Sequence, residues 1–582
     1  MKVRERVLRS LAMVSVLSLV ATACSTGGPA ASGAPSGSAG AGAGSPTPGG
    51  RVVVGSISDA KVLNPVLSTD VPSADVDQML YEPLLTVDPK NGQPAPDLAE
   101  KWTISPDSKT YTFTLRPGLV WSDGSPFTGE DFKFTAEAVM RSKTSVRKNI
   151  FQDIVGATDF GSGKATDISG IQVSGDTITV QFTKAFCPAL TDVGGFGIIP
   201  KSVFGKYIVP DDPSKNLDNA PENTKPPVSD GPFMFKEWVP NDHITLVANP
   251  HYFKGKPLLD EWDYKIVSDS TALAASLKTG EIDVGTVDPE QRDDLKKAGT
   301  LDFFDVPGRG YTYIGWNELR GGKEFFQDKT VRQALAYGLN IQEVVQKVLL
   351  GEGTKMIAHE PPVSWAYSES GLNPYNYDPK KAQSLLEGDG WKKGSDGVYQ
   401  KNGQKLAFTL YTNSGNKVRD TFQQVAVEQY KQIGVDVTAK TESFEALVDR
   451  LTKSKDPKYG AQGGHDYDAV IIGWSLGTDP DAYSIWDSTQ IKGGFDFVGY
   501  NDPTVDKALT DGRTMCQLDQ RKTAYQTFDK QLNEDQPYNF GFDPNELIFV
   551  NKKFQGVAPG PFGGNVGPGL AMWNIEKWWI KK

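Results

Sequence analysis

One short run, residues 467–480, constrains this chain more than any other part of it. Its first half is apolar and β-branched, which predicts a buried strand. Its second half leaves the strand through two glycines, Gly473 and Gly477, which flank Trp474, Ser475 and Leu476. Glycine lets another backbone come close, and α/β folds hold ligands beyond the carboxyl ends of strands. The run therefore predicts an α/β fold with a ligand site where this strand ends.

The same run also matches G-x-S-x-G, the nucleophile elbow of α/β-hydrolases, with Ser475 as the nucleophile. In those enzymes the histidine of the triad follows the serine. Here every histidine precedes Ser475: His243, His251, His359 and His465. We therefore expect a protein that is not an enzyme and has no catalytic residue, and keep a secreted serine hydrolase as an alternative. An ordinary core strand with a surface serine is another.

Length and charge narrow the class of protein. A chain of 582 residues is too long for one hydrophobic core, so about two to four domains are expected. The net charge is −11 and no basic stripe is present, which argues against nucleic acid as a partner.

The chain has only three cysteines, Cys24, Cys187 and Cys516. They form no Cys-x-x-Cys pair and no cluster with histidine, so we predict neither a metal site nor a cofactor. Cys187 and Cys516 can form one disulfide if the fold brings their Cα atoms within about 7 Å. The sequence alone leaves that pairing open.

Residues 1–23 have a basic start and an apolar core, residues 11–20, which suits a signal peptide and is short for a membrane span. The run Ala21-Thr22-Ala23-Cys24 resembles a bacterial lipobox, which implies a lipidated Cys24 on the extracytoplasmic face of the cell membrane. The alternative is ordinary secretory cleavage with a chance cysteine. Residues 24–50 are almost entirely Gly, Ala, Ser, Pro and Thr, so a disordered tether with a reach of about 25–30 Å is expected.

Local patterns in the body predict alternating strands and helices. Residues 111–116 alternate as a half-buried strand does, and Thr128 with Asp131 predicts a capping box at a helix start. Residues 406–411, 419–433 and 435–437 predict a strand, a helix and a strand, which together form a βαβ unit.

A series of motifs in one order carries a family resemblance. The chain resembles the large extracytoplasmic solute-binding proteins of ABC importers, family 5, the dipeptide, oligopeptide and nickel group. The resemblance covers residues 50–582 and rests on residues 98–102, 111–118, 123–127, 130–132, 230–233, 249–257, 280–283, 317, 331–335, 377–379, 433–437 and 473–480. Most of these motifs also have a purely structural reading as turns and strand ends.

The resemblance implies a periplasmic-binding-protein-like α/β fold, with two α/β lobes, a two-segment hinge and an extra subdomain. Lobe I would comprise residues 51–85, 171–270 and 536–582. The extra subdomain would comprise residues 86–170, and lobe II residues 271–535.

The resemblance also implies a function. The two lobes would close over an oligopeptide and deliver it to an ABC permease and its ATPase. In peptide-binding members the ligand lies between the lobes as an added strand. Gly473, Trp474, Ser475 and Leu476 would form the lobe II side of the site. The lobe I side would be Thr69, Asp70 and Val71, with Trp316 and Asn317 near the cleft.

One departure bears on the ligand's amino end. Dipeptide-type members place an Asp a few residues after Gly-Trp to hold the peptide ammonium, whereas residues 475–478 contain no acid. Asp479 or Asp481 could substitute; the alternative for both is a turn and a helix cap. The pattern is closer to binders of longer oligopeptides.

Other functions fit the same fold. The ligand could be another solute such as an oligosaccharide, or the protein could be a surface receptor for signalling peptides. Nickel is disfavoured because the histidines lack ligand spacing. We expect a monomer.

Overall fold

The computed structural model describes residues 46–208, 215–319, 323–452, 466–564 and 567–581. The predicted signal peptide, Cys24 and most of the predicted tether lie outside the described residues. Across the described ranges, no helix combines the length and the apolar character needed to cross a membrane.

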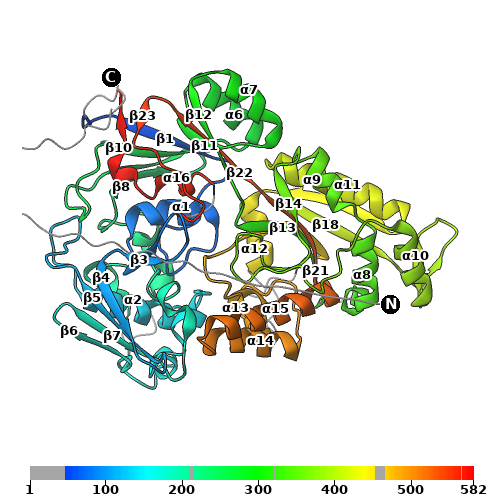
Figure 1. Ribbon diagram of the computed structural model, residues 1–582, viewed down its shortest axis with the longest axis horizontal. Helices are drawn as coiled ribbons and strands as arrows, with labels where there is room; N and C mark the ends of the chain where they lie inside the picture. Colours follow the sequence, from blue (N-terminus) through cyan, green and yellow to red (C-terminus); the bar gives the residue numbers. More distant parts are fainter. Residues whose placement is uncertain (1–45, 209–214, 320–322, 453–465, 565–566, 582) are drawn as a thin grey trace, which may run out of the picture. The chain divides into compact units, whose positions relative to one another are not determined.

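A seven-stranded sheet organises the first lobe (Figure 1). Its central strand β1 pairs in parallel with β10 and β11, and the outer strands pair antiparallel. Val52 and Val54 of β1 are fully buried, because alternate side chains of a central strand enter one core. The order is β12-β22-β11-β1-β10-β9-β8. The strands are β1 (Arg51–Ser56), β8 (Phe233–Val239), β9 (His243–Ala248), β10 (Glu261–Ile266), β11 (Val284–Thr286), β12 (Leu301–Val306) and β22 (Glu546–Asn551).

A four-stranded antiparallel sheet belongs to the same hydrophobic core, since one cluster contains both Phe113 of β5 and Trp262 of β10. The burial of β5 alternates as its sequence predicts. Helix α2 (Gly129–Arg141) begins after Thr128, which forms the predicted capping box with Asp131. The order is β4-β5-β7-β6, with β4 (Ala99–Ile104), β5 (Thr110–Leu115), β6 (Ile171–Ser174) and β7 (Thr177–Gln181).

A six-stranded sheet organises the second lobe. Its strand β20 is the predicted buried strand and lies between β13, antiparallel, and β18, parallel. Ala469 and Ile471 enter one core, Val470 and Ile472 the other. The predicted βαβ unit is confirmed, with β18 and β19 parallel and α11 (Lys417–Gln432) between them. The order β14-β21-β13-β20-β18-β19 comprises β13 (Gly310–Trp316), β14 (Gly353–Lys355), β18 (Ala407–Asn413), β19 (Asp436–Glu442), β20 (Ala469–Ser475) and β21 (Tyr538–Pro544).

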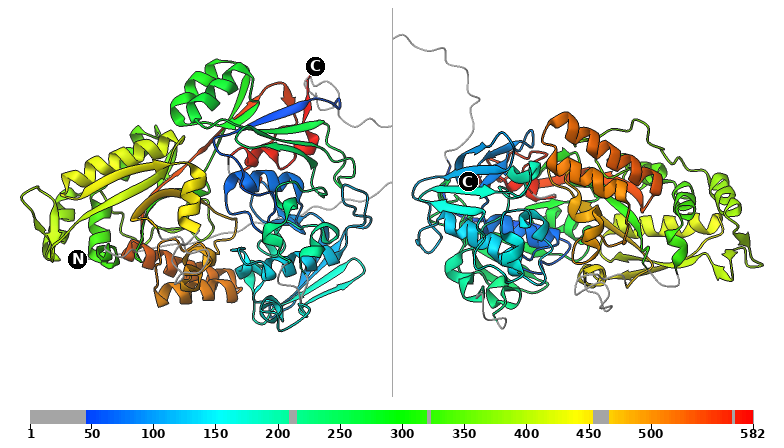
Figure 2. Two further views of the ribbon diagram at one scale, coloured as in Figure 1. Left: turned by 180° about the vertical axis from the view of Figure 1, so that it is seen from behind. Right: turned by 90° about the horizontal axis from the view of Figure 1, so that it is seen from below.

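Helices cover the sheets. In the second lobe α8 to α11 cover one face, while α12 to α15 cover the other, where α14 and α15 lie side by side (Figure 2). In the first lobe α6 and α7 cover one face and α1 the other. Their bounds are α1 (Val71–Leu80), α6 (Ser270–Thr279), α7 (Pro289–Lys297), α8 (Lys329–Tyr337), α9 (Ile341–Lys347), α10 (Pro379–Gly388), α12 (Phe444–Thr452), α13 (Tyr483–Trp486), α14 (Pro503–Thr514) and α15 (Leu518–Asp535).

Two segments cross between the lobes. Residues 307–309 connect β12 to β13, and Asn545 connects β21 to β22 (Figure 1). The crossings lie against each other, because a Cβ on Gly308 would meet Asp543 Oδ1 at 2.0 Å. Asn545 Nδ2 also donates to Asp305 Oδ1 at 2.8 Å. The two lobes therefore share a two-segment hinge.

Strand pairing departs from the predicted domain limits at three places. Strands β11 and β12 follow residue 271, where lobe II was predicted to begin, but they pair within the seven-stranded sheet of the first lobe. Strand β21 follows residue 536, where the last segment of lobe I was predicted to begin, but it pairs within the six-stranded sheet of the second lobe. Strands β6 and β7 follow residue 170, the predicted end of the extra subdomain, but they pair with its strand β5 in the four-stranded sheet. The boundaries of the domains are set by pairing between strands that are distant in the sequence. The motifs near residues 170, 271 and 536 give no indication of that pairing.

Candidate functional site

The site is a cavity of about 600 Å³ between the two lobes, within the usual range for small-ligand sites. The first lobe lines it with one face of α1, residues 147–150 and 190–197, and C-terminal residues 562–564 and 572–576. The second lobe lines it with residues 359–364 and 475–485. Arg309, at the hinge, also faces the cavity.

Three of the predicted site residues line this cavity: Ser475, Leu476 and Asp479. Ser475 is exposed at the end of β20. Leu476 is fixed by Arg309, whose backbone oxygen accepts from the Leu476 N–H at 2.9 Å and whose Nε donates to the Leu476 oxygen at 3.0 Å. The Arg309 Nη2 donates to the Gly564 oxygen at 2.7 Å. This arginine therefore ties the exit of β20 to the C-terminal segment.

Gly473 and Trp474 point into the second lobe and do not line the cavity. Trp474 stacks on Phe497, with ring centroids 5.2 Å apart, and its Nε1 donates to the Tyr538 hydroxyl at 3.2 Å. A Cβ on Gly473 would meet Arg419 Nη2 at 2.9 Å. The glycine thus makes room for a buried guanidinium of its own lobe.

Trp316 and Asn317 also lie away from the cavity, in the core of the second lobe, which differs from their predicted place near the cleft. Trp316 is fully buried against Phe326, with ring centroids 5.2 Å apart. The Asn317 amide donates to the Tyr467 oxygen at 2.7 Å. The reason is that β13 is an inner strand whose residues are all buried.

Thr69, Asp70 and Val71 precede the part of α1 that faces the cavity. Asp70 is the N-cap of α1, where Oδ1 accepts from the Ser73 N–H at 2.9 Å. The cavity is lined instead by Ala74, Asp77 and Gln78, which share one helical face. The i, i+3, i+4 spacing of these residues is a signal that could have identified them from the sequence.

A first group of carboxylates in the cavity surrounds Lys254. Its Nζ lies 2.7 Å from Asp97 Oδ1 and 3.5 Å from Glu82 Oε2. The Tyr252 hydroxyl donates to Glu82 Oε1. Burial alone would lower the pKa of Lys254, but the two carboxylates outweigh burial and raise it. Each carboxylate of this group thus touches a donor from the protein.

A second group of carboxylates comprises Asp192, Glu360, Asp479 and Asp481. Arg521 holds Asp479 with two bonds, of 2.6 Å and 2.9 Å, in the bidentate geometry that arginine favours. Arg513 Nε lies 3.0 Å from Asp481 Oδ2. Neither the pattern of the sequence nor a local motif pointed to Asp192 or Glu360.

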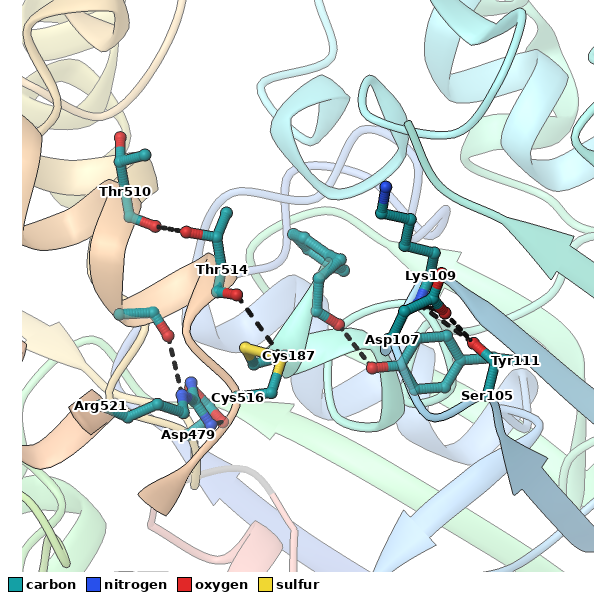
Figure 3. The surroundings of a disulfide bond; sticks show 12 residues. Ser105, Asp107, Lys109, Tyr111, Cys187, Asp479, Thr510, Thr514, Cys516 and Arg521 are labelled. Carbon is teal, nitrogen blue, oxygen red and sulfur yellow. Dashed lines mark hydrogen bonds and ion pairs between the residues drawn. A yellow bond between two sulfur atoms is a disulfide. The ribbon is translucent and has the colours of Figure 1, made fainter. Parts of the chain in front are cut away.

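A disulfide joins Cys187 and Cys516, with Cα atoms 5.1 Å apart (Figure 3). Cys187 begins a 3₁₀ turn, η1 (Cys187–Leu190), next to Phe186 of the first-lobe core. Cys516 lies between α14 and α15 of the second lobe. The bond therefore links the two lobes beside the second carboxylate group, and it forms the pairing that the sequence left open.

His359 is buried in the wall of the cavity. Trp486 Nε1 donates to its Nδ1 at 3.0 Å, and the Tyr311 hydroxyl lies 2.8 Å from the same atom. Because an indole N–H can only donate, the ring proton lies on Nε2. Burial lowers the pKa of His359 to about 3, so the ring is neutral near pH 7. Within the described ranges, no three His, Cys, Asp or Glu side chains are placed to hold a metal ion.

The model of the bacterial extracellular solute-binding proteins, family 5 (middle), matches residues 93–495. The chain belongs to this family. The family 5 match covers most of both lobes, the four-stranded sheet, the hinge segment at residues 307–309 and the exit of β20.

Relatives within family 5 extend the match to the whole chain. The oligopeptide-binding protein AppA of Bacillus subtilis is 32% identical over 584 residues and covers 100% of each chain. The oligopeptide-binding protein OppA of Lactococcus lactis subsp. lactis is 30% identical and covers 78% of each chain. The solved structure of AppA in complex with a nonapeptide has a TM-score of 0.81, covering 92% of this chain and 100% of that one.

Proposed function

We propose that this protein captures oligopeptides in the cavity between its two lobes and hands them to an ABC transporter. The observation that carries the proposal is the cavity at the hinge of a family 5 fold, lined by both lobes. Oligopeptide-binding relatives at 32% and 30% identity support a peptide as the ligand.

The ligand's main chain lies along residues 475–478, where β20 leaves its sheet. Ser475 and Gly477 are exposed there and both line the cavity. An extended peptide gains affinity from main-chain hydrogen bonds that do not depend on its sequence. Trp474 positions this segment from behind, through its stacking on Phe497.

Capture involves no chemical step. A serine nucleophile needs a general base within hydrogen-bond reach whose pKa lies near the working pH. The histidine in the cavity wall, His359, has a pKa near 3 and is hydrogen-bonded to Trp486 and Tyr311. Ser475→Ala is expected to leave peptide affinity within about twofold, as isothermal titration calorimetry would measure.

The protein acts as a monomer on the extracytoplasmic face of the cell membrane, anchored through lipid on Cys24, and its partners are the permease and its ATPase. The lipobox-like run before Cys24 supports the anchor. Cys24→Ser is expected to abolish incorporation of labelled fatty acid and to release the protein from membranes. Incorporation that persists in Cys24→Ser would contradict the anchor.

The direct test is mass spectrometry of ligands released by denaturing the purified protein. We expect a mixture of peptides, and titration with synthetic peptides should give heat of binding. A bound oligosaccharide, with no heat from any peptide, would instead support the second reading of the fold.

A further inference from the structure

The second carboxylate group contains more carboxylates than cations in contact with them. Arg521 contacts Asp479 and Arg513 contacts Asp481. Both guanidinium groups also act on Asp192, but from beyond ion-pair contact. Throughout the described ranges, Asp192 and Glu360 form no ion pair with any side chain of the protein. Both line the cavity, one from each lobe.

Glu360 is the more deeply buried of the two, with 3% of its surface exposed. In the part of the chain that the structure describes, its Oε1 has no hydrogen-bond partner. Another acid lies behind it, since the Glu360 backbone N–H donates to Asp529 Oδ1 at 3.3 Å. Buried acceptors are normally satisfied, so this oxygen is an acceptor available to whatever fills the cavity.

Asp192 faces the same space from the end of η1. In the described structure its carboxylate accepts one side-chain hydrogen bond, from the Thr191 hydroxyl at 3.5 Å. Arg513, Arg521 and Arg147 lie in its neighbourhood but form no ion pair with it. Burial, with Asp481 and Asp479, raises the pKa of Asp192, and burial, with Asp529 and Asp479, raises the pKa of Glu360. Both carboxylates therefore lie near Asp479, and a positive charge placed among them would be stabilised by both.

We propose that Asp192 and Glu360 form a subsite for a cationic group of the ligand, an alkylammonium or a guanidinium. This proposal rests on the proposed function, and it makes peptides with a positive charge at this position the favoured substrate class. Two parts of a peptide carry that charge, the N-terminal ammonium and a Lys or Arg side chain. The subsite lies at the lobe boundary, so the bound charge would be held by both lobes at once.

The test is calorimetry with four nonapeptides of Ala, Val and Ser that differ only in charge. Two of the peptides carry one central Lys, and the other two carry norleucine at that position. Each pair consists of one peptide with a free N-terminus and one with an acetylated N-terminus. Each peptide is titrated into the wild-type protein, Asp192→Asn, Glu360→Gln and the control Asp294→Asn, whose carboxylate lies outside the cavity and is paired with Lys278. Thermal melting of each variant checks that it is folded.

We expect the wild-type protein to lose about tenfold or more in affinity when the recognised charge is removed. Loss on acetylation assigns the ammonium to the subsite, and loss on norleucine substitution assigns the side chain. Both isosteric variants should abolish that difference while keeping the affinity for the uncharged peptide, and Asp294→Asn should retain the difference. Equal binding of all four peptides by the wild-type protein would overturn the subsite while leaving peptide capture intact. A charge preference that survives in both variants would overturn it as well. Failure of every peptide to bind would instead reject the proposed function.

Discussion

Two groups of buried carboxylates face the same cavity, and they differ in what lies against them. Around Lys254, one ammonium bridges Asp97 and Glu82, and Tyr252 completes the contacts. Around Glu360 and Asp192, the protein supplies no cation in contact within the described residues. A buried charge with a partner in its own chain contributes to the fold. One without such a partner is costly unless a proton or a ligand neutralises it.

The largest expected effect comes from removing the cation of the first group. Lys254→Met leaves Asp97, 1% exposed in its side chain, and Glu82 without an ammonium. We expect the free energy of unfolding to fall by about 3–5 kcal/mol in urea denaturation. The control is Lys278→Met, which removes an exposed pair with Asp294 and should leave the free energy of unfolding nearly unchanged. Equal losses would remove the distinction between a structural and a surface pair.

The second group should make stability depend on pH. Burial raises the pKa of Asp529, behind Glu360, to about 7, whereas an unfolded Asp titrates near 4. At Asp529 the folded state therefore binds more protons between these values, and the contribution of Asp529 to stability falls as pH rises from about 4 to 7, by up to about 1 kcal/mol per pH unit.

Urea denaturation across that pH range would measure the slope. Asp529 faces the Glu360 carboxyl and the neutral His359 and Tyr311, so Glu360 contributes with the same sign. Asp529→Asn should flatten the slope. A slope that Asp529→Asn leaves unchanged would contradict the raised pKa.

A third change, Arg521→Gln, removes a positive charge from the second carboxylate group and so increases its excess of negative charge. Arg521→Gln removes both bonds to Asp479 and should lower the free energy of unfolding by about 2 kcal/mol at pH 8. The loss should shrink at pH 5, because burial raises the pKa of Asp192 and Asp481, and these neighbours of Arg521 no longer need a guanidinium once they are protonated. A loss that is the same at both pH values would mean that Arg521 acts through packing alone.

The smallest expected effect is a gain in the stability of the ligand-free protein. Glu360→Gln removes an acid that has no cation in contact with it, so the ligand-free protein should become more stable by about 1 kcal/mol at pH 8. Differential scanning calorimetry on protein freed of ligand would measure the change. Destabilisation by Glu360→Gln would show that its carboxylate is satisfied in the fold.

The sequence predicted what depends on near neighbours. The capping box at Thr128 and the βαβ unit around α11 rest on local spacing and were confirmed. The burial of residues 469–472 followed from their apolar character. The family 5 resemblance predicted the two-lobe fold, because its motifs are spread over the whole chain.

The cavity wall could not be predicted in the same way. The family resemblance implied ligand contact for Trp316 and Trp474, but the position of their strands within the second sheet turns both into the core. Asp192 and Glu360 come to line one cavity only through tertiary packing. Whether a carboxylate has a partner is decided by residues distant in the chain, as with Asp479 and Arg521.

The bond between Cys187 and Cys516 adds a second attachment between the lobes, apart from the paired crossings at Gly308 and Asn545. A rigid body held at two separate points keeps only one freedom, a turn about the line that joins them. In the oxidised protein the lobes would therefore move relative to each other by rotation about that line, without shear and without twist about another axis.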